Sequence, residues 1–270
     1  RGENDKLIFQ TPLGSYAATR YGSDFFQIYR ADLVRILYQK ACKLGVDFQF
    51  GEEAFVKSTD KKSTVISSNG HDFRFDATVA ADGVHSATRE KFFKHRAPAF
   101  LNQVAYRATV PLKQIEGDWR RPQVNILVAS GSHIVLYPLV SRSLLNIVFC
   151  SDQSVWSSDG WSNSVDPEEI ITKFKNFVAV RNILGQIKRA HKWGLLGYNN
   201  KSNWHLDNLA LLGDACHPML PYLAQGANQA LEDAASLSHF LSQKKFSGVA
   251  QAFELYGNNR RSRVLKVQRA

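Results

Sequence analysis

The sequence predicts an α/β protein in which a β-rich segment interrupts an α/β domain and two long helices close the chain. Three observations support this fold class. Apolar residues recur at helical spacing after Arg30 and again after residue 226. Segments rich in Val, Ile, Leu and Tyr, separated by short turns, fill residues 103–150. Strand-like runs that end in Asp-Gly or Gly-Asp lie on either side of that region.

Composition narrows the class of protein and of partner. The 270 residues include 34 Lys and Arg against 24 Asp and Glu, a formal charge of +10, and 44% are apolar. These values exclude a disordered chain, and no apolar run is long enough to predict a membrane span. Basic residues cluster at 89–96 and 260–269 but form no recognised nucleic-acid-binding motif, so we expect small anionic ligands and no nucleic-acid partner.

The cysteines predict a reducing compartment and no metal site. Cys42, Cys150 and Cys216 are odd in number and far apart, and Cys216-His217 has no second Cys/His cluster. We therefore expect a cytoplasmic protein with small buried thiols. Residues 1–6 show no signal-peptide pattern, and the first residue is Arg rather than Met, which indicates a piece of a longer protein or a processed product.

The elements before residue 100 follow from periodicity and turn residues. A helix begins at Arg30, since apolar residues recur over 33–44, Asp32 suits the first turn and Gly45 suits the stop. The other elements expected here are a hairpin-like segment before Arg30, a hairpin of residues 52–58 and 63–68, a strand at 73–81 and a basic helix at about 86–94.

From residue 103 the pattern becomes that of an antiparallel meander. Asp166-Pro167-Glu168-Glu169 then caps a helix, with proline at the first helical position and acids in the first turn. The expected elements of this part are strands at 103–112, 123–129, 133–140 and 143–150, a short buried strand at 208–212, and helices at about 227–243 and 248–268.

Two segments carry most of the chemical information. In the first, a strand ends at Asp82-Gly83 and a helix with Arg89 in it follows; the alternative is an ordinary structural turn. In the second, a buried strand ends at Gly213, and Asp214 emerges where a ligand hydroxyl could bind. Gly226-Ala227 then opens a helix whose unpaired N–H groups suit an anion or an electron-rich carbonyl; the alternative is a capped helix after a loop.

Together these segments resemble the class A flavoprotein aromatic hydroxylases, the single-component FAD monooxygenases, over nearly the whole chain. Residues 29–33, Tyr-Arg-Ala-Asp-Leu, are similar to the family's His-Arg-Ala-Asp-Leu helix start. The resemblance implies a Rossmann-like FAD-binding domain, residues 1–100 and 200–270, lacking its N-terminal part and interrupted by a mixed-sheet substrate domain, residues 101–199. It assigns to the cofactor Arg30 (pyrophosphate), Asp82, Gly83 and Arg89 (FAD and NAD(P)H), Gly213 and Asp214 (ribityl chain), and Pro218, Gly226, Ala227 and Asn228 (beneath the flavin ring).

The resemblance also implies an activity. NAD(P)H reduces FAD, O2 then gives a flavin C4a-hydroperoxide, and its distal oxygen attacks a phenolic or aromatic-acid substrate. The cofactor performs this chemistry, while the protein binds, orients and excludes water. The positive end of the helix that starts at Gly226 suits the negative charge that the flavin gains on reduction. A base near the substrate hydroxyl would favour the reactive phenolate.

His133 and Tyr137 are the candidates for that substrate contact. They are four residues apart, so they lie on one face of a strand. Their spacing is similar to that of a His and Tyr pair in the substrate pocket of 3-hydroxybenzoate-type hydroxylases. The alternative is a histidine packed beside a core tyrosine. Gln225, polar and just before Gly226, is a further pocket candidate, and Cys216 and His217 are expected to shape their loop.

One departure from the family pattern stands out. The family begins with a βαβ unit bearing Gly-x-Gly-x-x-Gly, and this pattern occurs nowhere in the chain. That unit needs about thirty residues or more, and only 29 precede Arg30. We therefore expect residues 1–270 alone to hold FAD weakly or not at all. Two alternatives stay open at this point: a non-catalytic remnant that does not retain FAD, and a related FAD-dependent epoxidase or halogenase.

Overall fold

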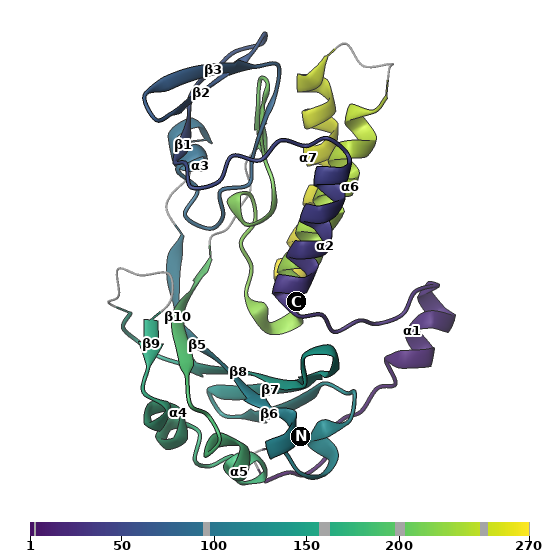
Figure 1. Cartoon of the computed structure of the whole chain (residues 1–270), viewed down its shortest axis with the longest axis vertical. Helices are drawn as coiled ribbons and strands as arrows, with labels where there is room; N and C mark the ends of the chain where they lie inside the picture. The colour runs from purple at the N-terminus through teal and green to yellow at the C-terminus, as the bar shows by residue number, and fades with distance from the viewer. Residues whose placement is uncertain (3, 94–97, 157–162, 198–202, 244–247, 270) are drawn as a thin grey trace. The chain divides into compact units, whose positions relative to one another are not determined.

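The computed structural model describes residues 1–2, 4–93, 98–156, 163–197, 203–243 and 248–269 (Figure 1). The chain forms two compact units. The first contains residues 1–47 and 102–195, and the second contains residues 48–101 and 196–270. Strands β5 (Ala99–Pro111) and β10 (Ala190–Gly197) each continue from one unit into the other.

A six-stranded sheet dominates the first unit. Its strand order is β6-β7-β8-β5-β10-β9, and the β6–β7, β7–β8, β8–β5 and β10–β9 pairs are antiparallel. The predicted meander is confirmed for β6 to β8, whereas β5 pairs on the far side of β8. The remaining bounds are β6 (Asn125–Ala129), β7 (Ser132–Leu139), β8 (Leu144–Asp152), β9 (Asn163–Val165), α1 (Gly14–Tyr21), α2 (Arg30–Lys43), α4 (Pro167–Lys173) and α5 (Arg181–Leu184).

One face of this sheet forms the core of the first unit. Tyr106, Phe149, Ile134 and Leu127 lie in one row across four strands and are fully buried. Phe174, which follows α4, packs against them with its ring centroid 4.9 Å from that of Phe149. The helix cap is also confirmed, because the Asp166 carboxylate accepts a hydrogen bond from the Glu168 N–H at 3.0 Å.

The second unit holds two small sheets and two long helices. One sheet is an antiparallel β1-β2-β3 meander, and the other has the order β11-β12-β4, with β12 and β4 parallel. Figure 1 shows α6 and α7 side by side. The bounds are β1 (Ala54–Thr59), β2 (Thr64–Ser68), β3 (His71–Phe75), β4 (Thr78–Ala80), α3 (Ala87–Phe93), β11 (His205–Leu206), β12 (Leu209–Leu211), α6 (Gly226–Leu241) and α7 (Val249–Arg269).

The core of the second unit lies between β12 and the two helices. Trp204, Leu209, Leu211, Phe253 and Tyr256 are buried together there. The Tyr256 hydroxyl donates to the Leu211 carbonyl oxygen at 3.1 Å, so α7 is bonded directly to the last residue of β12. This contact fixes the end of the strand from which the Gly-Asp segment begins.

The structure corrects three expectations. The strand predicted at 73–81 is two strands, because β3 pairs with β2 while β4 leaves that hairpin and pairs with β12. The segment before Arg30 forms the helix α1 rather than a hairpin, and the glycine after it, Gly22, takes the left-handed conformation that ends it. Cys42 is exposed, whereas Cys150 and Cys216 are buried as expected, and none of the three forms a disulfide. Among the described residues, no helix is long and apolar enough to cross a membrane.

Candidate functional site

The Gly-Asp segment forms a tight loop at the end of β12. Gly213 has a φ of +63°, which favours glycine, and it starts a single 3-10 turn. Gly213, Ala215, Cys216 and Pro218 are buried, whereas Asp214 is exposed. The exposed carboxylate of Asp214 therefore lies just after the carboxyl end of the buried strand β12.

The same loop lies beside the N-terminus of α6. A Cβ added to Gly226, the first residue of α6, would lie 4.0 Å from Asp214 Oδ1 and 3.8 Å from a side-chain carbon of Met219. Gln225 precedes the helix and is half-buried, and Ala227 and Asn228 are exposed on its first turn. The predicted cofactor residues of this part of the sequence are thus brought together.

A buried carboxylate, Asp233 of α6, holds the loop in place. Its Oδ2 accepts a hydrogen bond from the Gly213 N–H at 3.1 Å and lies 2.5 Å from His217 Nε2. Its Oδ1 accepts from Arg260 Nε of α7 at 2.8 Å. Asp233 is fully buried, and His217 is 1% exposed. Three segments that are distant in sequence therefore meet on one side chain.

Arg260 extends this network towards the surface. It donates to Glu232 at 2.6 Å and to Gln229 Oε1 at 2.7 Å, and Arg263 donates to the same Glu232 through two nitrogens. Burial alone would raise the pKa of Asp233, but the hydrogen bonds from His217, Arg260 and Gly213 outweigh it and hold that pKa below its ordinary value. Asp233 is therefore a buried anion with every oxygen bonded.

The Asp-Gly turn is bonded to the Gly-Asp loop. Gly83 has a φ of +79°, and the Asp82 carboxylate accepts from the Thr88 N–H at 3.2 Å, which caps α3. Arg89 of α3 is fully buried. Its guanidinium donates to the carbonyl oxygens of Ala215 at 3.0 Å and Val84 at 2.6 Å. Arg89 joins the two motifs, and its contact with a nucleotide stays a prediction.

This arrangement fits the ribityl and ring end of FAD. The exposed carboxylate of Asp214 can accept hydrogen bonds from hydroxyl groups, and charged acceptors form the stronger bonds. The first-turn N–H groups of α6 lack partners within the helix and lie at the positive end of its dipole, which suits an electron-rich carbonyl. Among the described residues, no group of three His, Cys, Asp or Glu side chains could hold a metal ion.

Arg30 lies in the first unit, unlike Asp214. It is exposed at the first position of α2, and the neighbouring Asp32 is bonded by Arg142 Nε at 2.9 Å and by a second nitrogen of the same guanidinium. These hydrogen bonds lower the pKa of Asp32, so the start of α2 is tied to the loop between β7 and β8 by a charged pair. The guanidinium of Arg30 itself is available to an anion at this helix start.

His133 and Tyr137 lie on one face of β7, and both are half-buried. Burial lowers the pKa of His133, which favours the neutral imidazole that a general base requires. The strand placement and the shared face are confirmed. Gln225 belongs to the second unit, so the sequence-predicted substrate residues come from both units.

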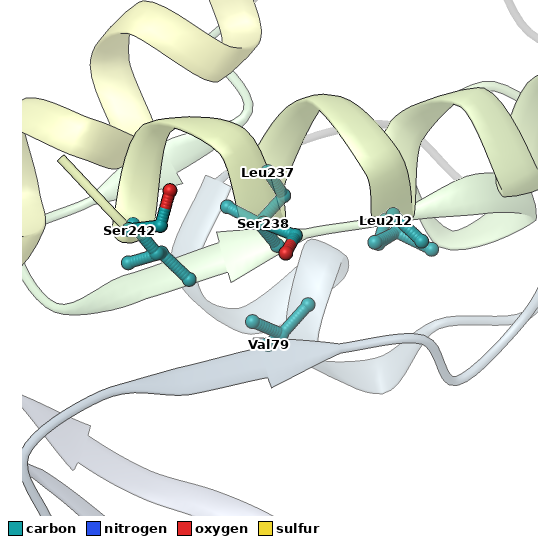
Figure 2. Close-up of a pocket in the computed structure, with 7 residues that line it drawn as sticks. Val79, Leu212, Leu237, Ser238 and Ser242 are labelled. Carbon is teal, nitrogen blue, oxygen red and sulfur yellow. The ribbon is translucent and has the colours of Figure 1, made fainter. Parts of the chain in front are cut away.

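A separate apolar groove lies between β4, β12 and α6 (Figure 2). Figure 2 shows Val79 opposite Leu212 and Leu237, with Ser238 and Ser242 on the helix side. Its volume is about 570 Å³, and none of its lining residues titrates. The groove therefore offers apolar surface and no acid–base chemistry.

The sequence interpretation missed the roles of Asp233 and Arg260. A local signal existed, because Gln229 and Asp233 are four residues apart and so share one side of a helix. Leu237 is buried on the same side of α6, so this side faces the core and not solvent. Polar residues there need hydrogen-bonding partners inside the protein. The partner, Arg260, is 27 residues away and could not be chosen from the cluster of basic residues at 260–269.

The chain is similar to known FAD-dependent proteins over most of its length. The FAD binding domain family matches residues 17–270. The FAD-dependent monooxygenase OpS4 of Beauveria bassiana is 32% identical over 263 residues, which cover 92% of this chain and 61% of the relative. The 3-amino-4-hydroxybenzoate 2-monooxygenase PtmB3 of Streptomyces platensis is 30% identical over 270 residues, covering 100% of this chain and 67% of the relative.

A solved structure supports the same assignment. A salicylate hydroxylase substrate complex superposes with a TM-score of 0.78 at 26% identity, covering 89% of this chain and 64% of that one. The chain thus spans about two thirds of the length of these relatives. The α/β fold class and the FAD cofactor that the sequence indicated are confirmed. The chain belongs to the FAD binding domain family, among the class A flavoprotein aromatic hydroxylases.

Proposed function

We propose that the protein to which these residues belong hydroxylates a phenolic or aromatic-acid substrate, using FAD, NAD(P)H and O2. One observation carries this proposal: Asp214 is an exposed carboxylate beside the start of α6, in a loop fixed by the buried Asp233. That arrangement fits a polyhydroxy chain that leads to a ring whose negative charge needs stabilisation. The names of two relatives, a hydroxybenzoate monooxygenase and a salicylate hydroxylase, support hydroxylation of an aromatic ring over halogenation or epoxidation.

The division of labour that we propose differs from the two compact units, since residues 1–47 cluster with residues 102–195. We propose that residues 1–100 and 200–270 bind FAD and that residues 101–199 bind substrate. When bound, FAD supplies the electron transfer and oxygen activation. Asp214 accepts hydrogen bonds from the ribityl hydroxyls, the α6 N-terminus stabilises negative charge on the ring, and Arg30 binds the pyrophosphate. Pro218, Ala227 and Asn228 lie beneath the ring, and Asp82, Gly83 and Arg89 serve the nucleotide side.

The residues proposed to contact the substrate remove its phenol proton and orient its ring. The neutral imidazole of His133 accepts the proton of the substrate phenol, which makes the ring more electron-rich, and the Tyr137 hydroxyl and the Gln225 amide orient that ring. We further propose that the protein acts in the cytoplasm, since its three cysteines form no disulfide.

The decisive test concerns Asp214. In the longer protein to which these residues belong, replacing Asp214 with Ala should weaken FAD retention about tenfold or more, because a charge-assisted acceptor is lost. Fluorescence of released flavin after dialysis measures retention, and the exposed Glu254 of α7 provides a matched charge control as Glu254→Gln. Equal retention in Asp214→Ala and wild type would refute the cofactor assignment. The activity itself is checked by oxygenated product formed with NAD(P)H consumption on a phenolic acid.

A further inference from the structure

An arginine from the six-stranded sheet holds the start of α2. Arg142 lies in the short loop between β7 and β8. Its guanidinium donates to both carboxylate oxygens of Asp32, through Nε at 2.9 Å and through a second nitrogen. Both residues belong to the first unit, so this contact lies within one compact part of the chain. Two such N–H···O bonds fix the direction of the carboxylate as well as its distance.

The same guanidinium also lies over the ring of Tyr29. Its carbon is 5.6 Å from the ring centroid, a distance at which a cation is attracted to an aromatic face. Tyr29 is the N-cap residue of α2, and its carbonyl oxygen accepts from the N–H groups of Asp32 and Leu33. Arg142 therefore contacts the residue directly before Arg30 and the residue two positions after it. The start of α2 cannot turn about its axis without breaking one of these contacts.

The loop that carries Arg142 is itself fixed to the sheet. The chain turns back at Ser143, which has a φ of +51° and whose N–H donates to the Val140 carbonyl oxygen at 3.0 Å. The Ser143 carbonyl oxygen accepts from the N–H of Leu112, the residue directly after β5, at 2.9 Å. Three strands of the sheet, β7, β8 and β5, therefore hold this loop. Arg142 binds α2 from a rigid platform.

This contact differs from an ordinary surface ion pair. The side chain of Asp32 is 13% exposed, whereas both side chains of the pair between Arg121 and Asp118 in the same unit are at least 60% exposed. Exposed pairs are screened by solvent and add little, but a covered, two-bonded carboxylate is held firmly. The hydrogen bonds from Arg142 are the main cause that keeps the pKa of Asp32 below its ordinary value. Paired in this way, the carboxylate opposes an anion at the helix start less strongly.

We propose that Arg142 is a positioning residue for the cofactor: it holds the start of α2 in the orientation in which Arg30 binds the FAD pyrophosphate. This inference rests on the proposed function, which gives Arg30 that role. Within the described part of the chain, Arg30 forms no ion pair, so its charge is not taken up by a carboxylate of the protein. Arg142 acts through the neighbours of Arg30 and does not touch FAD. The strand that carries His133, β7, leads directly into the Arg142 loop, so one strand supports both sites.

The test is a double-mutant cycle on FAD affinity. The apoprotein of the longer protein to which these residues belong is titrated with FAD, and flavin fluorescence reports binding. Arg30→Gln should weaken binding roughly tenfold or more, and Arg142→Gln roughly 3- to 10-fold. The double variant should bind FAD no more weakly than Arg30→Gln alone, because Arg142 acts through Arg30. Arg142→Lys keeps the charge but loses the planar fork, so it should restore only part of the affinity.

The decisive variant is Asp32→Asn, because it separates positioning from a direct attraction between Arg142 and FAD. If Arg142 attracted the pyrophosphate directly, removing the negative charge of Asp32 would free it and strengthen FAD binding. If Arg142 positions Arg30, the loss of its charged partner loosens the start of α2. Asp32→Asn should then weaken FAD binding by a factor similar to that of Arg142→Gln.

The control is Arg121→Gln, which breaks the exposed ion pair of the same unit and should bind FAD as wild type does. Urea unfolding midpoints of the apoproteins are measured beside binding, and FAD losses that simply follow those midpoints would show a merely structural role. Unchanged binding in Arg142→Gln, losses that multiply in the double variant, tighter binding in Asp32→Asn, or an equal loss in Arg121→Gln would each overturn the positioning role. Failure of the proposed function gives a different result: Arg142-dependent FAD binding without any oxygenated product.

Discussion

The Asp233 network and the face of the six-stranded sheet that carries His133 and Tyr137 bond similar side chains in opposite ways. In the network, Arg260 binds two carboxylates and every oxygen of Asp233 is bonded. On the sheet face, Arg107 has an aromatic neighbour but no carboxylate in the described residues, and Asn146 keeps an unbonded amide nitrogen. The difference teaches that the loop for the cofactor is organised before any ligand arrives. The sheet face, by contrast, carries a buried amide nitrogen, that of Asn146, which no group of the described residues bonds.

The largest expected effect comes from breaking the network at its centre. Asp233→Ala leaves Arg260 and His217 buried without their anion, which should lower the free energy of unfolding by about 3–5 kcal/mol. Urea unfolding followed by circular dichroism measures the change. Glu232→Gln, one residue away, is the control and should cost under about 1 kcal/mol, because that partly exposed carboxylate is screened by solvent. Similar losses in both variants would show that Asp233 is not central.

A smaller effect on stability is expected from replacing Gly213, and none or a gain from replacing Gly226. Gly213→Ala should cost about 1–2 kcal/mol, because Gly213 has a φ of +63° and the new Cβ would lie 3.3 Å from the Cβ of Ala230. Gly226→Ala meets only an ordinary contact and starts a helix, so stability should stay equal or rise. FAD retention, measured beside stability, should fall in both variants if the α6 start approaches the cofactor. Equal stability of the two variants would contradict this distinction.

The smallest effect belongs to the sheet face. Burial lowers the pKa of His133, so the folded protein binds a proton there less readily than the unfolded chain does. The contribution of His133 to the free energy of unfolding is therefore fully present above the pKa of the unfolded chain, about 6.5. It is lost as the pH falls through the lower pKa of the folded protein. An NMR titration of the imidazole, assigned with His133→Asn, should give a midpoint below that of the urea-unfolded chain. A midpoint at or above the unfolded value would contradict the lowering of the His133 pKa by burial.

The sequence was informative wherever a local pattern decides the structure. The helices after Arg30 and Gly226 and the cap at Asp166 depend on spacing and capping within a few residues, and all three formed as predicted. The strand at 73–81 was predicted wrongly because an apolar run does not reveal that its two halves pair with different partners. The segment before Arg30 lacked helical periodicity, yet residues 14–21 form α1.

The motif residues of the candidate site were predictable from the sequence, whereas the buried residues that hold the loop in place were not. Gly213, Asp214 and Gly226 came from short motifs, and the structure brings them together. Asp233 and Arg260 were not predicted because their hydrogen bond joins two different helices. The sequence also gives no reason to choose Arg260 over the other basic residues of its cluster.

The buried Arg89 has a consequence for protein engineering. Its guanidinium donates hydrogen bonds to the carbonyl oxygens of both Val84 and Ala215, so the Asp-Gly turn and the Gly-Asp loop are fixed to each other. A chimera that imports residues 82–89 from a relative while keeping residues 213–218 would join halves shaped for different partners. Exchanging both segments together preserves that match, so the pair is the natural unit for recombination and for designed libraries.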